Sequence, residues 1–135
     1  MIYLDSWVWL EDALGGDQQD VARDVIEAAN DTGGVVSAIA LTEVDYVLAR
    51  EADRTTADLV TSAMEDLDRI HVVPVSGEVA LYASRLRSKY YERRSRELSY
   101  ADAIHLATAV LLDCESFHTG DSDFEAIEEL PTTVH

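Results

Sequence analysis

Short apolar runs alternate with helix-like segments along the whole chain, and this alternation limits the possible folds more than any other feature. The strand-like runs cover residues 2–5, 35–39, 70–75 and 115–119. The segments between them keep an apolar period near 3.6 residues and predict helices starting at Ser6, at about Asp17, at a cap at Thr42, at about Thr56, at Ser76 and at Ser99. Strands that alternate with helices favour a mostly parallel sheet with helices on both faces. We therefore expect an α/β fold with four strands, and a fifth at the edge if residues 131–135 are extended.

The size of the chain indicates one domain, residues 1–135. At 135 residues, 47% of them hydrophobic, it can bury a core without disulfides or a structural metal. Its single cysteine, Cys114, has no partner for an internal disulfide, which fits a reducing compartment. The sequence shows no signal peptide and no apolar run near the ~20 residues of a membrane span, so we expect a cytoplasmic protein without a membrane partner.

The charge balance is strongly acidic. There are 27 acidic residues against 10 basic ones, and the formal net charge is −17. Regular apolar periodicity argues against disorder, so we interpret this surplus as a salt-adapted, halophilic surface. In molar salt the Debye length falls to about 3 Å, and carboxylates then repel one another weakly. This hypothesis predicts loss of folding at low salt.

Four acids are expected at one edge of the sheet. Asp5 ends the first strand, Glu43 lies just beyond the second, Asp102 opens an apolar helix, and Asp121 follows the fourth strand. In parallel α/β sheets this edge is where ligands bind. Clustered carboxylates repel one another by ~1 to 4 kcal/mol per pair and need a counter-charge, and oxygen ligands select Mg²⁺ or, as a substitute, Mn²⁺. Such an ion can activate water for hydrolysis of a phosphodiester.

Each of these acids also has a structural interpretation. Asp5 can cap a helix, Glu43 can be a first-turn acid, and Asp102 can form a capping box with Ser99. Asp121 can be a turn residue. Singly, the structural roles are more common, whereas the shared position of all four favours a site.

The same residues resemble a known family, the PIN-domain nucleases, and within it the VapC-type toxins. The motifs are Leu4-Asp5-Ser6, Leu41-Thr42-Glu43-Val44, Leu98-Ser99-Tyr100-Ala101-Asp102-Ala103, and Thr119-Gly120-Asp121 with Asp123-Phe124. They occur in order from Met1 to about Glu128. The resemblance implies a PIN-like three-layer sandwich and an Mg²⁺-dependent endoribonuclease that cuts tRNA or ribosomal RNA. It also implies a cognate antitoxin as partner and a homodimer.

Carried over residue by residue, the resemblance assigns the catalytic and metal positions to Asp5, Glu43, Asp102 and Asp121. Asp123 is a candidate additional ligand, and Ser6 and Thr119 match supporting polar positions. A helical His105, one turn beyond Asp102, is interpreted as a hydrogen-bonded core histidine, although a ligand or base role stays open.

Most of the basic residues fall in one segment. Six of the ten lie between residues 85 and 96: Arg85, Arg87, Lys89, Arg93, Arg94 and Arg96. With tyrosines between them, they are candidates for contacting RNA phosphates, and a solvated helix end is an equally good interpretation.

Other classes of protein fit less well. A receiver-type phosphoacceptor domain needs a lysine near the acidic edge, and the only lysine, Lys89, falls within a predicted helix. A HAD-type phosphatase needs a second aspartate two positions after the first, where this chain has Trp7. A housekeeping RNA-processing PIN domain or a non-catalytic partner-binding PIN module stays open as the alternative.

Overall fold

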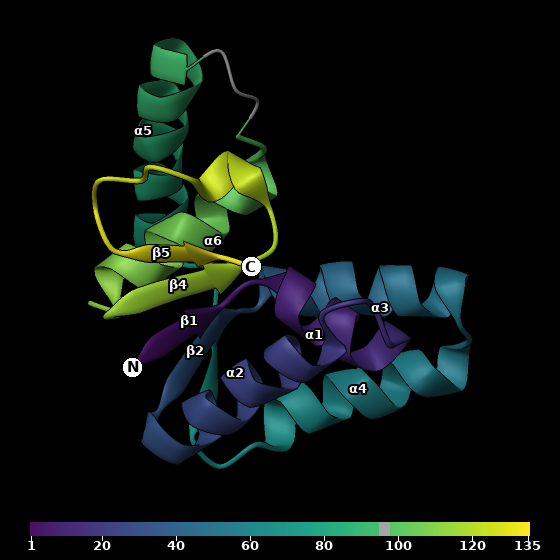
Figure 1. Ribbon diagram of the computed structural model, residues 1–135. Helices are drawn as coiled ribbons and strands as arrows, with labels where there is room; N and C mark the ends of the chain where they lie inside the picture. The colour runs from purple at the N-terminus through teal and green to yellow at the C-terminus, as the bar shows by residue number, and fades with distance from the viewer. Residues whose placement is uncertain (95–97) are drawn as a thin grey trace.

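Five short strands form one parallel sheet at the centre of the molecule. The computed structural model describes residues 1–94 and 98–135, apart from the side chains of residues 92–94. The strands are β1 (Ile2–Leu4), β2 (Gly34–Ser37), β3 (Ile70–Val73), β4 (Ser116–Thr119) and β5 (Thr132–Val134). They lie in the order β3-β2-β1-β4-β5, and each neighbouring pair is parallel. The expected α/β architecture is confirmed, with the short strand near the carboxyl terminus at one edge (Figure 1).

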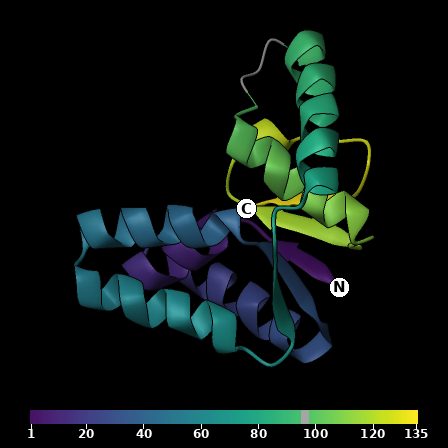
Figure 2. The same cartoon turned by 180° about the vertical axis from the view of Figure 1, so that it is seen from behind.

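Helices cover both faces of this sheet. They are α1 (Ser6–Leu14), α2 (Gln19–Thr32), α3 (Ile39–Glu51), α4 (Arg54–Asp66), α5 (Gly77–Arg94) and α6 (Tyr100–Leu111), followed by the 3-10 turn η1 (Ser122–Phe124). The helices α1 to α4 lie on one side of the sheet and α5 and α6 on the other, as the two opposite views show (Figures 1 and 2). None of the described helices is both long and apolar enough to cross a membrane.

The alternation of side chains along the strands divides the core into two layers, because neighbouring residues of a strand point to opposite faces. Tyr3, Val35 and Phe117 are buried against α5 and α6. Leu4 and Val36, one position further along their strands, are buried against α1 to α4. Each fully buried side chain of this size contributes about 1.5–3 kcal/mol relative to exposure.

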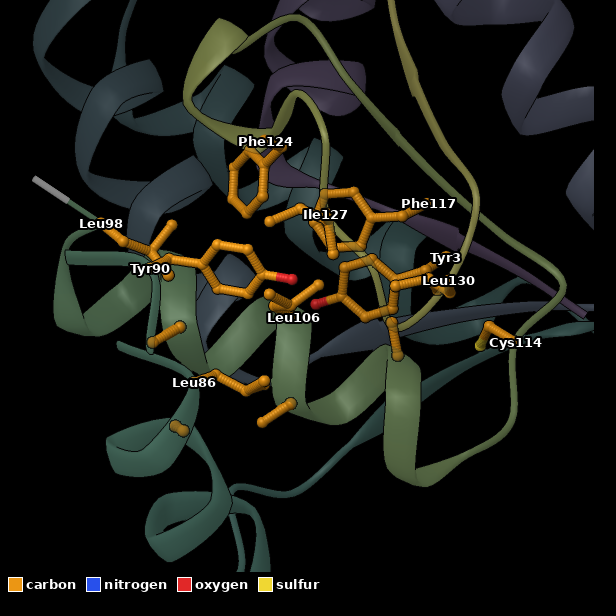
Figure 3. Close-up of a cluster of buried hydrophobic side chains, with 14 of the residues drawn as sticks. Tyr3, Leu86, Tyr90, Leu98, Leu106, Cys114, Phe117, Phe124, Ile127 and Leu130 are labelled. Carbon is orange, nitrogen blue, oxygen red and sulfur yellow. The ribbon is translucent and has the colours of Figure 1, made fainter. Parts of the chain in front are cut away.

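An aromatic stack lies at the centre of the layer between the sheet and α6 (Figure 3). The rings of Tyr3 and Phe117 are nearly parallel, with centroids 4.9 Å apart. Phe124, just after β4, packs on Phe117 at 4.7 Å. This stack fixes η1 to the sheet and so restrains the segment that follows β4.

Several helix ends form as their sequences predict. Ser99 and Asp102 make the expected capping box at the start of α6. The Ser76 hydroxyl accepts a hydrogen bond from the Val79 amide at the start of α5. The helix α2 ends at Gly33, whose φ of 110° suits glycine.

The expected start of α3 was wrong. The helix begins at Ile39, so the second strand ends at Ser37 and Thr42 lies within the helix rather than capping it. Ala38 occupies the cap position and offers no capping side chain. Glu43 therefore lies beyond the first turn of the helix and has no role there in balancing the helix dipole.

The strand register brings the ends of β1 and β4 level with each other. Leu4 pairs with His118, and the next amide, that of Asp5, donates to the His118 carbonyl at 3.0 Å. Asp5 thus lies beside Thr119 at the carboxyl edge of the sheet. Gly120 then passes close to α1, where a Cβ would lie 2.2 Å from the Trp7 ring. A side chain at this position would collide with the Trp7 ring, so glycine lets the chain pass α1 and continue into Asp121.

Candidate metal centre

The structure brings the acids selected from the sequence together at the carboxyl edge of the sheet. Asp5 follows β1 and Asp121 follows β4, while Glu43 comes from α3 and Asp102 from α6. The charges of Asp5 and Asp121 both act on Asp102, and one histidine contacts both Asp5 and Glu43. The acids separate into two groups with different surroundings.

The first group is a carboxylate trio, consisting of Asp102, Asp121 and Asp123. Each offers one oxygen, and these three oxygens lie within 4.8 Å of one another. Among the described residues this is the group of acidic, histidine or cysteine side chains with the spacing of a metal site. Three carboxylate oxygens at such spacing suit a hard divalent cation, Mg²⁺ or Mn²⁺.

Asp102 combines a structural role with a place in the trio. Its backbone amide donates to the Ser99 hydroxyl at 3.1 Å, and its carboxylate accepts the Ser99 amide at 3.4 Å. Burial, together with the charges of Asp5 and Asp121, raises the pKa of Asp102 to about 6, against the opposing hydrogen bonds from Ser99. Burial is the main cause of this shift, and the two neighbouring carboxylates add to it.

Asp121 is held in position by its own turn. Its amide donates to the Thr119 hydroxyl at 3.0 Å, and its Oδ1 accepts the Asp123 amide at 2.9 Å. The structural interpretation is therefore correct for both Asp102 and Asp121. The same hydrogen bonds fix the backbone from which the trio projects, so the two interpretations do not compete.

The second group is a histidine-bound pair, Asp5 and Glu43. His105 Nε2 lies 2.5 Å from Glu43 Oε1 and 3.5 Å from Asp5 Oδ1. Asp5 occupies the N-cap position of α1, as considered from the sequence, but its side chain makes no capping hydrogen bond. Instead its Oδ2 accepts the Thr119 hydroxyl at 2.7 Å, and its Oδ1 accepts the Ser6 hydroxyl at 3.5 Å.

Opposing effects act on the proton affinity of Asp5 and His105. Burial raises the pKa of Asp5, against the lowering effects of His105 and Thr119. Burial disfavours the charged form of His105, but the hydrogen bond to Glu43 and the charges of Asp5, Glu43 and Asp102 outweigh it and raise its pKa. The raised pKa favours the protonated imidazole, whose charge would offset those of Asp5 and Glu43.

Tyr3 holds the other side of the His105 ring. The Tyr3 hydroxyl lies 2.6 Å from His105 Nδ1 and accepts the Ser37 amide at 3.0 Å. All three side chains, Tyr3, Ser37 and His105, are fully buried. The result is a line of polar contacts from the end of β2 through Tyr3 and His105 to Glu43.

The role of Tyr3 was not visible in the sequence. His105 was expected to be a hydrogen-bonded core residue, which the structure confirms, but its acidic partners were not foreseen. Tyr3 occupies an ordinary strand position, and 102 residues separate it from His105. Two features of the sequence could have indicated this contact. Tyr3 places a hydroxyl on the α6 face of the central strand, and His105 lies one turn beyond Asp102.

The basic segment does not form one continuous surface where the structure describes it. Lys89 pairs with Glu129 at 2.7 Å and Glu128 at 3.0 Å. Arg85 lines a separate pocket with Glu78, whereas Arg87 packs on two tyrosine rings. Arg96 and the side chains of Arg93 and Arg94 lie outside the described part of the chain.

Comparison with known proteins gives one family and a consistent set of folds. The PIN domain family matches residues 2–130, nearly the whole chain. A search of the curated proteins finds no match.

Three solved structures illustrate the shared fold. Mycobacterium tuberculosis VapC20, described as a sarcin–ricin loop cleaving toxin, has a TM-score of 0.79 at 19% identity, covering 97% of this chain and 99% of that one. VapBC2 from Rickettsia felis, bound to a promoter DNA fragment, has a TM-score of 0.77 at 18% identity, covering 98% of each chain. A toxin–antitoxin complex from Klebsiella pneumoniae has a TM-score of 0.70 at 24% identity, covering 96% of this chain and 95% of that one. With the acidic site at the expected edge of the sheet, these results confirm the resemblance drawn from the sequence motifs, and the chain belongs to the PIN domain family.

Proposed function

We propose that this chain is a divalent-metal-dependent endoribonuclease and the toxin of a toxin–antitoxin pair. The observation that supports it most directly is the carboxylate trio, whose oxygens lie within 4.8 Å of one another at the carboxyl edge of the sheet. The family match and the fold shared with VapC20 support the same proposal.

The donor set fits the cofactor expected from the sequence. Asp102, Asp121 and Asp123 provide carboxylate oxygens, and Asp102 and Asp121 have no ion-pair partner among the described residues. Mg²⁺, or Mn²⁺ in its place, would be held by these residues, with Asp5 close enough to add its charge. When bound, such an ion supplies a more acidic water and neutralises charge that develops on phosphate oxygens.

The other side chains of the site orient and polarise it. Burial raises the pKa of Asp102 to about 6, which still leaves its carboxylate available at neutral pH. The Thr119 hydroxyl donates a hydrogen bond to Asp5 and accepts one from the Asp121 amide, so it links the two groups of acids. Glu43 is partly exposed and is held by His105, so it presents a carboxylate at the border of the site for a proton from water.

The proposed substrate is structured RNA. VapC20 is described as cleaving the sarcin–ricin loop, which makes ribosomal RNA the first substrate to test and tRNA the second. The structures of related folds with antitoxins support a cognate antitoxin as the protein partner. We also propose that the chain forms a homodimer. Its surface is proposed to be salt-adapted, so the assay is best done in molar KCl.

The test is to incubate the purified chain with ribosomal RNA and Mg²⁺ and to map the new RNA ends. We expect discrete Mg²⁺-dependent cuts that leave 5′-phosphates and that EDTA abolishes. Asp121→Asn should remove them, whereas Asp24→Asn, an exposed acid on α2, should not. If the folded, Mg²⁺-loaded chain leaves both ribosomal RNA and tRNA intact, the nuclease proposal fails and the partner-binding alternative replaces it.

A further inference from the structure

A small cleft between α5 and the start of α6 has an arginine packed between aromatic rings. It is lined by Ser84, Arg87, Ser88, Tyr91 and Tyr100 and has a volume of about 290 Å³. We call it the Arg87 cleft. Its size is close to the lower limit of ~300 Å³ for ligand pockets and suits one planar group rather than an extended ligand.

The Arg87 side chain is fixed before any ligand arrives. Its Nε donates to the Leu98 carbonyl at 2.9 Å. Its guanidinium carbon lies 4.5 Å from the centroid of the Tyr100 ring and 5.1 Å from that of Tyr91. A cation held in this way loses little conformational entropy when it contacts an anion.

The two tyrosines of the cleft are exposed. Tyr100 is 74% exposed and Tyr91 is 45% exposed, although both rings are large and apolar on their faces. Exposed aromatic rings beside an arginine are the usual elements with which proteins bind unpaired nucleotides, since bases stack on the rings and phosphates approach the cation.

A second arginine–tyrosine contact in the same molecule provides a comparison. Arg50 lies 5.2 Å from the centroid of the Tyr46 ring, and Tyr46 is 61% exposed. That pocket, however, is also lined by Asp45 and Glu65. Among the side chains that the structure describes, none that lines the Arg87 cleft is acidic, on a chain with 27 acids. A polyanion is therefore repelled less at the Arg87 cleft than at the Arg50 contact.

The cleft and the carboxylate trio share the first turn of α6. Tyr100 is the first residue of this helix, and Asp102 follows two positions later on a different side of it. We propose that the Arg87 cleft binds one unpaired nucleotide of the RNA substrate, with its base stacked on Tyr100 and its phosphate beside Arg87. This inference rests on the proposed function and identifies the part of the substrate that the chain recognises.

The test measures RNA affinity separately from cleavage. Binding of a 5′-labelled single-stranded oligoribonucleotide is followed by fluorescence anisotropy in EDTA over a range of KCl concentrations. Tyr100→Ala is expected to weaken binding about tenfold. Tyr100→Trp should retain the affinity, because stacking needs a ring and no hydroxyl. Arg87→Gln should weaken binding. It should also reduce the slope of log affinity against log salt concentration by about one, as expected for the loss of one phosphate contact.

Tyr46→Ala is the matched control, because it removes the same type of exposed ring and cation contact. It should change the affinity less than twofold, and both alanine variants should unfold at the wild-type temperature. Equal RNA affinities for the two variants would overturn the proposal. It would equally be overturned if Tyr100→Ala kept RNA affinity but no longer bound the antitoxin, since the cleft would then be a protein contact.

The outcomes separate this inference from the nuclease proposal. A chain that binds RNA through Tyr100 but cuts none retains the cleft proposal and ends the nuclease proposal. If the wild-type chain cuts RNA but Tyr100→Ala binds RNA as tightly as wild type, the nuclease proposal is retained and the cleft proposal is wrong. If the wild-type chain neither binds nor cuts RNA, both are wrong.

Discussion

The histidine-bound pair and the carboxylate trio contain the same chemical group in opposite surroundings. Asp5 and Glu43 receive a counter-charge from the polypeptide, because the fully buried His105 contacts both. Asp102 and Asp121 are positioned by backbone amides and form no ion pair among the described residues, and the charge of Asp102 acts on His105 from beyond ion-pair distance. The fold therefore offers Asp5 and Glu43 a counter-charge within the polypeptide and leaves Asp102 and Asp121 to be neutralised by a cation from solution.

This difference predicts different consequences for loss of a residue from each group. A change at the histidine-bound pair should mainly lower stability, since it leaves charges buried without a partner. A change in the trio should mainly lower cation affinity.

The largest effect is expected for His105→Leu. Removing one partner of a buried charge contact costs about 3–5 kcal/mol, so the free energy of unfolding should fall by about that amount. Chemical denaturation in metal-free buffer measures it. His71→Leu, at an exposed position on β3, is the control and should change stability little. Adding Glu43→Gln to His105→Leu should restore part of the loss, and a double variant less stable than the single one would contradict the counter-charge role.

The next largest effect is on cation affinity in Asp121→Asn. Asparagine can still accept the Asp123 amide and caps as well as aspartate, so stability should stay within about 0.5 kcal/mol of wild type. Mn²⁺ affinity, measured by calorimetric titration, should fall by more than the roughly 10- to 100-fold that loss of an outer-shell partner costs. Unchanged affinity, or a loss of stability equal to that of His105→Leu, would remove the distinction between the two groups.

Much of this arrangement could be predicted from the sequence, because strand ends and helix caps are local signals. Asp5 and Asp121 each come after an apolar run. In a parallel sheet, residues at the ends of such runs lie at the carboxyl edge, so their positions could be predicted. The Ser99–Asp102 capping box is similarly visible from a three-residue spacing.

The parts that could not be predicted depend on contacts distant in sequence or on missing signals. The start of α3 was misplaced because Ala38 offers no capping side chain and residues 38–41 are all apolar, as in a continuing strand. The contact of Tyr3 with His105 follows from the packing of α6 on β1, and no local period specifies it. The separation of the acids into two groups depends on that same contact.

The pH dependence of the metal-free chain should reflect the trio. The folded-state pKa of Asp102 is about 6, above its usual 3.8, so protonation stabilises the folded state. This contribution is fully present below pH 3.8 and is lost as the pH rises through about 6. Denaturation curves recorded between pH 3.8 and about 6 measure this fall in the free energy of unfolding. In Asp102→Asn, the part of the fall that is due to Asp102 should be absent. Wild-type Mn²⁺ affinity should rise through the same range, and a flat profile would contradict the assignment.

The smallest difference between the two groups of acids is expected in the response of their variants to salt. Raising KCl to about 1 M shortens the Debye length to about 3 Å and should stabilise the metal-free wild-type chain, in keeping with its net charge of −17. Asp121→Asn should gain less than wild type by about a few tenths of a kcal/mol, because one repelling charge of the partly exposed trio is gone. His105→Leu should show the wild-type increment. A chain equally stable in dilute buffer and in molar KCl would end the salt-adaptation hypothesis.

The most direct test of the central claim is to locate a bound cation by paramagnetic broadening. Substoichiometric Mn²⁺ is added to the ¹⁵N-labelled, metal-free chain, and the amide signals are recorded. The structure predicts that the signals of Ala101 to Ala103 and Gly120 to Asp123 broaden first, while those of other acidic segments such as Asp20 and Asp24 on α2 stay sharp. Uniform weak broadening over the acidic surface, or broadening centred elsewhere, would show that the trio is not a metal centre.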